Sequence, residues 1–259
     1  MNVNVYGTKP YSIALIHGGP GAPGQMSSVA KVLSDSFGVL EPIQTADTID
    51  GQIQELKEIV EHYFQDPGII IGYSWGAWLS YLFTATYPRY VKKLILVSSG
   101  PFQESYVPYI HEQRSFRVTE GQLEDLKRLS LLLETPSTID TTDLFKKLFL
   151  LFSQTDAYAP IQSEDDTILF QPNIFFKIMG EASYLRKSGK LSSVGACITC
   201  PVVAIHGDHD PHPSQGVKKP LASTLKDFRF ILLTKCGHTP WNERYAKDKF
   251  YEILRGEIR

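Results

Sequence analysis

Residues 68–79 read Gly-Ile-Ile-Ile-Gly-Tyr-Ser-Trp-Gly-Ala-Trp-Leu, an apolar run that passes through a glycine-flanked serine into a second apolar run. We interpret this order as a strand, a sharp turn and a helix, with Ser74 at the tip of the turn. Gly72 and Gly76 fit such a turn, because the strand and the helix pass too close there for a Cβ. In this context the pattern G-x-S-x-G predicts a nucleophile elbow, which holds a serine hydroxyl exposed on a strained backbone.

Two later segments strengthen a prediction that the pentapeptide alone leaves weak, since a glycine-rich turn with a surface serine shows the same letters. Residues 202–210 read Val-Val-Ala-Ile-His-Gly-Asp-His-Asp, and residues 230–238 read Phe-Ile-Leu-Leu-Thr-Lys-Cys-Gly-His. Each segment is an apolar strand that runs into a polar loop. The loops supply an acid and then a histidine, in the chain order that a serine, an acid and a histidine take on this type of sheet.

The predicted roles follow from the chemistry of these side chains. A serine hydroxyl is a poor nucleophile until a base takes its proton, so Ser74 is the predicted nucleophile and His238 the predicted base. Asp210 is the predicted acid, which fixes the tautomer of the histidine and stabilises its charged form. Asp208 is the alternative acid. Asp210 is preferred because it lies further from the strand, where the loop can turn toward His238.

A glycine-rich stretch, His17-Gly18-Gly19-Pro20-Gly21, follows the first predicted strand. Such a loop can direct a backbone N–H at an oxyanion, and the residue after the nucleophile supplies a second donor. We therefore predict that the backbone N–H groups of Gly19 and Trp75 form an oxyanion hole. The loop fits neither G-x-x-x-x-G-K-[ST] nor G-x-G-x-x-G, so no nucleotide cofactor is expected.

Several histidines near the predicted acid raise the possibility of a metal site. They are His206, His209 and His212. Their spacing runs from a strand into a loop and matches no H-E-x-x-H or related pattern, so we expect no metal there.

Apolar runs and helical patterns alternate along the chain, which predicts a mostly parallel, doubly wound α/β sheet. The runs are short, continuous and rich in Ile, Val and Leu, as expected for strands buried on both faces. One intervening helix is predicted over Asp50 to Gln65, capped by Thr48 or Asp50. The predicted strands are Ile13–Ile16, Gly38–Leu40, Gly68–Ile71, Leu94–Val97, Val202–Ile205 and Phe230–Leu233.

The alternation breaks between the fourth and fifth predicted strands. Helical patterns without convincing strands occur there, over Gln122–Leu133, Thr142–Phe152 and Pro172–Lys187. We predict a core formed by residues 1–100 and 197–259, and an α-helical cap inserted over residues 101–196. Ligands of open α/β sheets bind beyond the carboxyl ends of the strands, so a cap there would shape the pocket. The alternative is a separate helical domain without a role at the site.

The composition excludes several classes of partner. The chain has 259 residues and a formal net charge of −2, which gives no electrostatic argument for binding nucleic acid or an anionic membrane. Neither a signal peptide nor a run of 18 apolar residues is present, so we expect a soluble, cytoplasmic protein. The three cysteines, an odd number, are expected to be reduced thiols.

The motifs resemble those of the α/β-hydrolase superfamily over nearly the whole chain. Within it, His17-Gly-Gly-Pro-Gly21 and Gly72-Tyr-Ser-Trp-Gly76 resemble the prolyl iminopeptidase-type group, which removes N-terminal residues from short peptides. The resemblance implies a triad at Ser74, Asp210 and His238 and a helical cap. That group usually carries Asp-Gln-Arg-Gly after its second core strand, where this chain reads Glu41-Pro-Ile-Gln-Thr-Ala-Asp47.

Three functions remain open on these residues. The first is a serine hydrolase that cleaves a small ester, thioester or amide through an acyl-enzyme at Ser74; cap aromatics such as Phe116, Phe152, Phe175 and Phe176 can line its acyl pocket. The second is an aminopeptidase acting on short peptides, which needs a carboxylate for the amine, for example Glu181. The third is a ligand-binding receptor on the same fold, because the fold alone does not fix the function.

Overall fold

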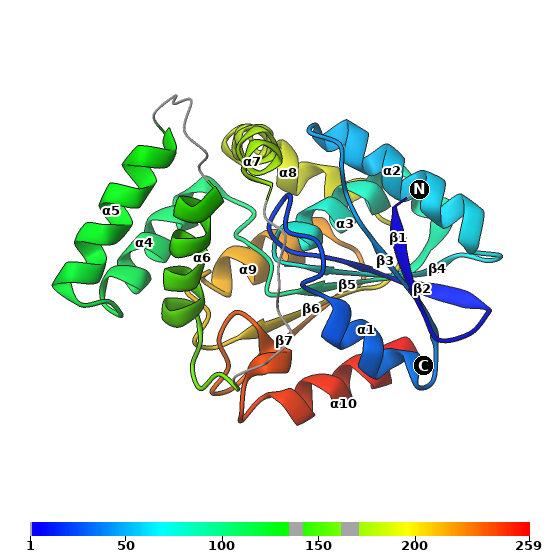
Figure 1. Cartoon of the computed structure of the whole chain (residues 1–259). Coiled ribbons are helices and arrows are strands. Elements are labelled where there is room, and N and C mark those ends of the chain that lie inside the picture. Colours follow the sequence, from blue (N-terminus) through cyan, green and yellow to red (C-terminus); the bar gives the residue numbers. More distant parts are fainter. Residues whose placement is uncertain (1, 135–141, 162–170) are drawn as a thin grey trace.

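A seven-stranded sheet runs through the centre of the computed structural model, which describes residues 2–134, 142–161 and 171–259 (Figure 1). The strand order is β1-β3-β2-β4-β5-β6-β7, and every neighbouring pair is parallel except β1 with β3. This confirms the predicted α/β fold, and each of the six predicted strands is present. The bounds are β1 Val3–Tyr6, β2 Tyr11–Ile16, β3 Gly38–Pro42, β4 Gly68–Tyr73, β5 Val91–Val97, β6 Val202–Gly207 and β7 Phe228–Leu233.

Alternate residues of the central strands build two separate hydrophobic cores, one on each face of the sheet. Ile70 and Leu94 belong to the core under one set of helices, whereas Ile71 and Ile95 belong to the core on the opposite face. Figure 1 shows α2 and α3 on one side and α1 and α10 on the other. A sheet covered on both faces explains the continuous apolar runs in the sequence. The helices are α1 Ser27–Ser34, α2 Ile49–Tyr63, α3 Trp75–Thr86, α9 Gln215–Thr224 and α10 Lys247–Ile258.

The helix predicted over Asp50 to Gln65 is α2, and Thr48 is its cap. The Thr48 hydroxyl accepts a hydrogen bond from the backbone N–H of Gly51 at 3.1 Å. Two short helices, α1 and α9, were not predicted, because eight to ten residues show too little periodicity to stand out.

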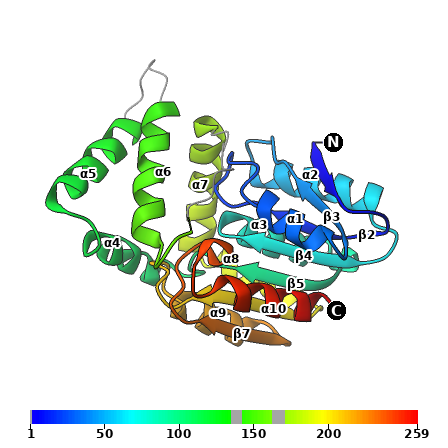
Figure 2. The ribbon, with the colours of Figure 1, turned by 60° about the horizontal axis from the view of Figure 1, so that its bottom comes forward.

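The described residues between β5 and β6 are mostly helical, and we call this part of the chain the insertion. Figures 1 and 2 both place α4, α5 and α6 to one side of the sheet, at the left, while α7 lies closer to the core. The helices α5, α6 and α7 match the predicted ones, whereas α4 and the short α8 were not predicted. None of the helices in the described ranges has the length and apolar character needed to cross a membrane. The bounds are α4 Val107–Ser115, α5 Glu120–Glu134, α6 Thr142–Asp156, α7 Pro172–Lys187 and α8 Lys190–Ser193.

Two polar contacts join α7 to the start of α2. The Glu181 carboxylate accepts a hydrogen bond from the backbone N–H of Ile49 at 2.9 Å, and Lys177 forms an ion pair with Asp47. Glu181 thus satisfies an N–H group at the first turn of α2, where helices lack internal acceptors and favour negative charge.

Replacing Thr48 with Ala should lower the free energy of unfolding by about 1 kcal/mol, because the Gly51 N–H loses its side-chain acceptor. Urea denaturation measures this loss. Ser36→Ala is the control, since Ser36 is exposed beyond the end of α1. An equal loss in both variants would contradict the capping role.

Candidate active site

Ser74 occupies the turn between β4 and α3 with a backbone conformation that is rare for a residue with a side chain. Its φ is 52° and its ψ is −114°. A non-glycine residue with positive φ is strained and persists only where its surroundings impose it. One restraint is the Ser74 N–H, which donates to the Val97 carbonyl of β5 at 3.0 Å.

The two flanking glycines leave room for a close approach of backbone segments. A Cβ on Gly72 would overlap the backbone of Gly76, and a Cβ on Gly76 would overlap the carbonyl oxygens of Ile16 and His17. The start of α3 therefore lies directly against the end of β2 and the glycine-rich loop. These close contacts explain why the G-x-S-x-G pattern has glycine at both flanking positions.

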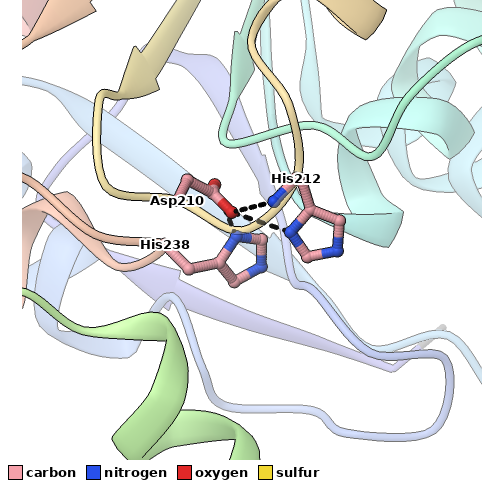
Figure 3. Close-up of side chains that lie close together, drawn as sticks. All are labelled: Asp210, His212 and His238. Carbon is pink, nitrogen blue, oxygen red and sulfur yellow. Dashed lines mark hydrogen bonds and ion pairs between the residues drawn. The ribbon is translucent and has the colours of Figure 1, made fainter. Parts of the chain in front are cut away.

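His238 and Asp210 lie beside Ser74 in a continuous hydrogen-bonded chain. His238 Nε2 is 3.1 Å from Ser74 Oγ. Figure 3 shows the other side of the ring, where His238 Nδ1 is 2.8 Å from Asp210 Oδ2. Since a carboxylate only accepts, Nδ1 carries the proton and Nε2 is left to accept from the serine. Asp208, the alternative acid, instead accepts a hydrogen bond from the Cys236 N–H at 3.2 Å.

A buried carboxylate that the sequence analysis missed holds the loop of His238. Glu243 accepts hydrogen bonds from the N–H groups of Tyr158, Ala159 and Gly237 at 2.7, 2.7 and 2.9 Å. It is 1% exposed, so these donors replace water around its oxygens. Glu243 thereby ties the loop to the chain that leaves α6.

The insertion also contacts the histidine loop through Asp156 at the end of α6. The backbone carbonyl of Asp156 accepts a hydrogen bond from the His238 N–H at 2.8 Å. The Asp156 side chain is paired with Arg114 of α4, whose Nε lies 2.8 Å from Oδ1. Although burial alone raises the pKa of Asp156, hydrogen bonding and charge from Arg114 lower it below its usual value.

Opposing effects set the charge states of the acid and the base. Burial alone raises the pKa of Asp210, but its electrostatic interactions with the surrounding imidazoles, above all His238, and the hydrogen bond from His212 bring it well below its usual value. Burial alone lowers the pKa of His238, whereas the charge and hydrogen bond of Asp210 raise it above its usual value. The pair therefore favours an ionised carboxylate beside a histidine of increased basicity.

The glycine-rich loop, predicted to supply one oxyanion donor, is tightly curved. Gly19 has a φ of +35° and Gly21 a φ of +71°, and the Gly19 carbonyl accepts from Ala22 N–H at 2.9 Å. Among the described residues, no acceptor is recorded for the N–H groups of Gly19 and Trp75. Their role as oxyanion donors stays a prediction.

Tyr73, the residue before the serine, packs against both loops and was not singled out from the sequence. A Cβ on Gly18 would lie only 2.7 Å from the Tyr73 ring. The centroid of the Tyr73 ring is 5.1 Å from that of His238. Its hydroxyl is 3.1 Å from Thr239 Oγ1. The side chain fills the space between the glycine-rich loop and the histidine loop.

Two of the histidines considered for a metal site, His206 and His212, lie near the Asp210 carboxylate, with His206 Nε2 3.5 Å from Oδ2. His206 Nε2 lies 2.8 Å from the His212 carbonyl oxygen, and the ring of His209 packs edge-on against Tyr158. Only His212 joins Asp210 and His238 in a group whose donor atoms lie within 4.8 Å of one another. In this group His212 Nδ1 and His238 Nδ1 each lie 2.8 Å from an oxygen of Asp210, and Cys197, Cys200 and Cys236 form no disulfide.

Aromatic residues of the insertion reach the glycine-rich loop. The ring of Phe149 from α6 lies 3.4 Å from the position of a Cβ on Gly19, and it packs against Phe175 of α7 at 6.1 Å between centroids. Two other aromatics considered for a pocket have different surroundings. Phe116 is 77% exposed, and Phe152 stacks beneath the guanidinium of Arg114 at 4.0 Å.

The combination of a strained serine turn, a glycine-rich loop, and an acid followed by a histidine places the chain in a fold class of hydrolytic enzymes. Comparison with models of protein families supports this fold class. The family model described as "alpha/beta hydrolase fold" matches residues 11–241, and the chain belongs to this family. Among curated proteins, none matches.

Solved structures share the fold at low sequence identity. VinJ has a TM-score of 0.71 at 16% identity, with 99% of this chain and 93% of that chain covered. A monoacylglycerol lipase from Paleococcus ferrophilus has a TM-score of 0.65 at 14% identity, with coverage of 99% and 97%. Est816, described as an N-acyl homoserine lactone degrading enzyme, has a TM-score of 0.65 at 16% identity, with coverage of 98% and 95%.

Two glycine substitutions test the close approach at the serine turn. Gly76→Ala should reduce the midpoint of thermal unfolding and the yield of folded protein, because the new Cβ overlaps two carbonyl oxygens. A Cβ on Gly180 in α7 would have no atom within 4 Å. Because alanine favours the helix more than glycine does, Gly180→Ala should stabilise the protein by about 0.5 to 1 kcal/mol. Calorimetry compares the two. A Gly76→Ala protein as stable as the wild type would contradict the packing described above.

Proposed function

We propose that the protein is a serine hydrolase that cleaves small esters with an apolar acyl group through an acyl-enzyme at Ser74. The observation that carries this proposal is the hydrogen-bonded chain from Asp210 through His238 to Ser74 on a strained turn. The N–H groups of Gly19 and Trp75 are the proposed oxyanion hole. Residues 101–196 are proposed to form the cap, and the rest of the chain the core.

The reaction uses each of these groups in turn. His238 Nε2 accepts the proton of Ser74 while the serine oxygen attacks the acyl carbon, and the carbonyl oxygen becomes an oxyanion held by Gly19 and Trp75. Asp210 stabilises the imidazolium that forms. The tetrahedral intermediate expels the alkoxide, which takes the proton from His238 and leaves as the alcohol. Water, deprotonated by His238, then attacks the acyl-enzyme and releases the acid and free Ser74.

The surroundings of the site favour an ester or thioester over a peptide amine. Phe149 lies beside Gly19 and packs against Phe175, so an apolar acyl chain has aromatic neighbours at the glycine-rich loop. An aminopeptidase needs a carboxylate for the substrate's ammonium. Glu181, the residue considered for that role, accepts the N–H of Ile49 at the start of α2 instead. The lipase and the lactone-degrading enzyme named above provide precedents for ester substrates on this fold.

A panel of synthetic substrates tests the proposal and its alternatives. We expect wild-type protein to hydrolyse p-nitrophenyl esters of short and medium chain length, and Ser74→Ala to lose at least about 10³-fold in kcat. Proline and other aminoacyl-naphthylamides should be poorer substrates. Ser36→Ala, remote from the site, is the control for handling and stability.

Two other outcomes would change the assignment. Ser74-dependent cleavage of the naphthylamides at rates above those of the esters would favour the aminopeptidase. No turnover of either class and no labelling of Ser74 by a fluorophosphonate would overturn the catalytic proposal and favour a ligand-binding receptor.

The electrostatics of the pair predict the pH dependence of ester hydrolysis. The base must be unprotonated to act, and its pKa is raised above the ordinary value of about 6.5. Activity should therefore be full above this raised pKa and be lost as the pH falls through it. In Asp210→Asn the raising charge is gone, so the acid limb of kcat/KM should move to lower pH while kcat falls steeply. A limb that does not move would exclude Asp210 as the partner of the base.

A further inference from the structure

A second histidine shares the carboxylate of Asp210. His212 Nδ1 lies 2.8 Å from Asp210 Oδ1, and the His212 backbone N–H donates to the same oxygen at 2.9 Å (Figure 3). His238 Nδ1 lies 2.8 Å from the other oxygen, Oδ2. The hydrogen bonds of the two carboxylate oxygens are thus divided between these two histidines, while His206 Nε2 lies 3.5 Å from Oδ2, at a longer distance than His238 Nδ1. The three residues of Figure 3 come from the loops after β6 and β7.

The two imidazole rings also contact each other. Their centroids are 4.6 Å apart with an angle of 32° between the planes. His212 is 15% exposed and His238 13% exposed, while Asp210 is fully buried. Because a carboxylate only accepts, His212, like His238, carries its proton on Nδ1 when neutral. His206 fixes the backbone of the same loop, since its Nε2 donates to the His212 carbonyl at 2.8 Å.

We infer that His212 is a positioning residue, which holds Asp210 Oδ1 so that Oδ2 faces His238 and the His238 ring is kept in line with Ser74. This inference rests on the proposed serine hydrolase function. A carboxylate held by a single partner can rotate about its χ2 torsion, which is broad. Two N–H donors from one residue, the backbone and the ring of His212, remove that freedom at one oxygen.

Burial, together with nearby positive charge, makes His212 a neutral donor. Burial lowers the pKa of His212 and outweighs the opposing effect of Asp210, and positive charge on His238 and Arg114 lowers it further. The charged or titratable groups that face it are Asp210, His238, His206 and Arg114. At neutral pH the ring therefore adds a hydrogen bond to the carboxylate without adding a second positive charge beside the imidazolium that catalysis creates on His238.

Two substitutions separate the hydrogen bond from the ring. His212→Phe keeps a flat ring beside His238 but lacks the donor, whereas His212→Asn keeps an N–H donor near the position of Nδ1 but lacks the ring. The matched control is His209→Phe, because His209 lies in the same loop and its ring packs on Tyr158 without touching Asp210. The readout is the second-order rate of labelling of Ser74 by a fluorophosphonate, measured between about pH 5 and 9. This probe requires no knowledge of the substrate.

We expect His212→Phe to slow labelling by about 10- to 100-fold through loss of alignment. In this variant the acid limb of the labelling rate plotted against pH should move to higher pH, because a carboxylate with fewer hydrogen-bond donors raises the pKa of His238. His212→Asn should stay within about 3-fold of the wild type, with its limb within about 0.3 pH units. His209→Phe should match the wild type. Thermal unfolding of each variant checks the fold, and His212→Leu replaces the Phe variant if that protein does not fold.

Three results would overturn the inference. In the first, His212→Phe labels at the wild-type rate with an unmoved limb. In the second, His212→Asn falls as far as His212→Phe, so the ring and not its donor matters. In the third, the rate falls but the limb does not move, which indicates packing alone. Absence of Ser74-dependent labelling in the wild-type protein is a different failure, because it overturns the proposed function itself.

Discussion

The close approach of α3 to the end of β2 is the constraint on which the site depends. Gly76 allows it, because any side chain there would overlap the carbonyl oxygens of Ile16 and His17. The approach imposes the positive φ of Ser74 and brings the first turn of α3 beside the glycine-rich loop. Tyr73 then spans the two loops, with its ring under Gly18 and against His238. One backbone contact thus brings together Ser74, the proposed nucleophile, with the glycine-rich loop and the histidine loop.

Buried carboxylates complete the arrangement at the carboxyl edge of the sheet. Glu243 is surrounded by three backbone N–H groups, and Asp210 by two histidine rings and one backbone N–H. A buried carboxylate that is shielded from water is stable only when hydrogen-bond donors or opposite charges replace the water around its oxygens. The donors to the two carboxylates differ in whether they can change their charge. Backbone N–H groups hold Glu243 in a fixed structural role, whereas the donor from His238 can become a cation, which makes Asp210 suited to supporting proton transfer.

The sequence predicted the elements whose signals are local. Strands buried on both faces appear as continuous apolar runs, and Ser74, Asp210 and His238 each follow such a run. The remaining features depend on partners distant in the chain. Glu243 binds N–H groups some 85 residues earlier, and Glu181 binds one 132 residues earlier. No spacing rule in a single sequence reveals such pairs. His212 was considered only as a metal ligand, since its role depends on the orientation of two loops.

The central claim is that Ser74 forms a covalent acyl intermediate. The most direct test is a brief reaction with p-nitrophenyl acetate, quenched in acid and followed by intact-protein and peptide mass spectrometry. We expect one acetyl group on the peptide that contains Ser74, absent from Ser74→Ala and greatly reduced when His238 is replaced by Ala. An acetyl group on another residue, or the same adduct in the Ser74→Ala protein, would contradict it.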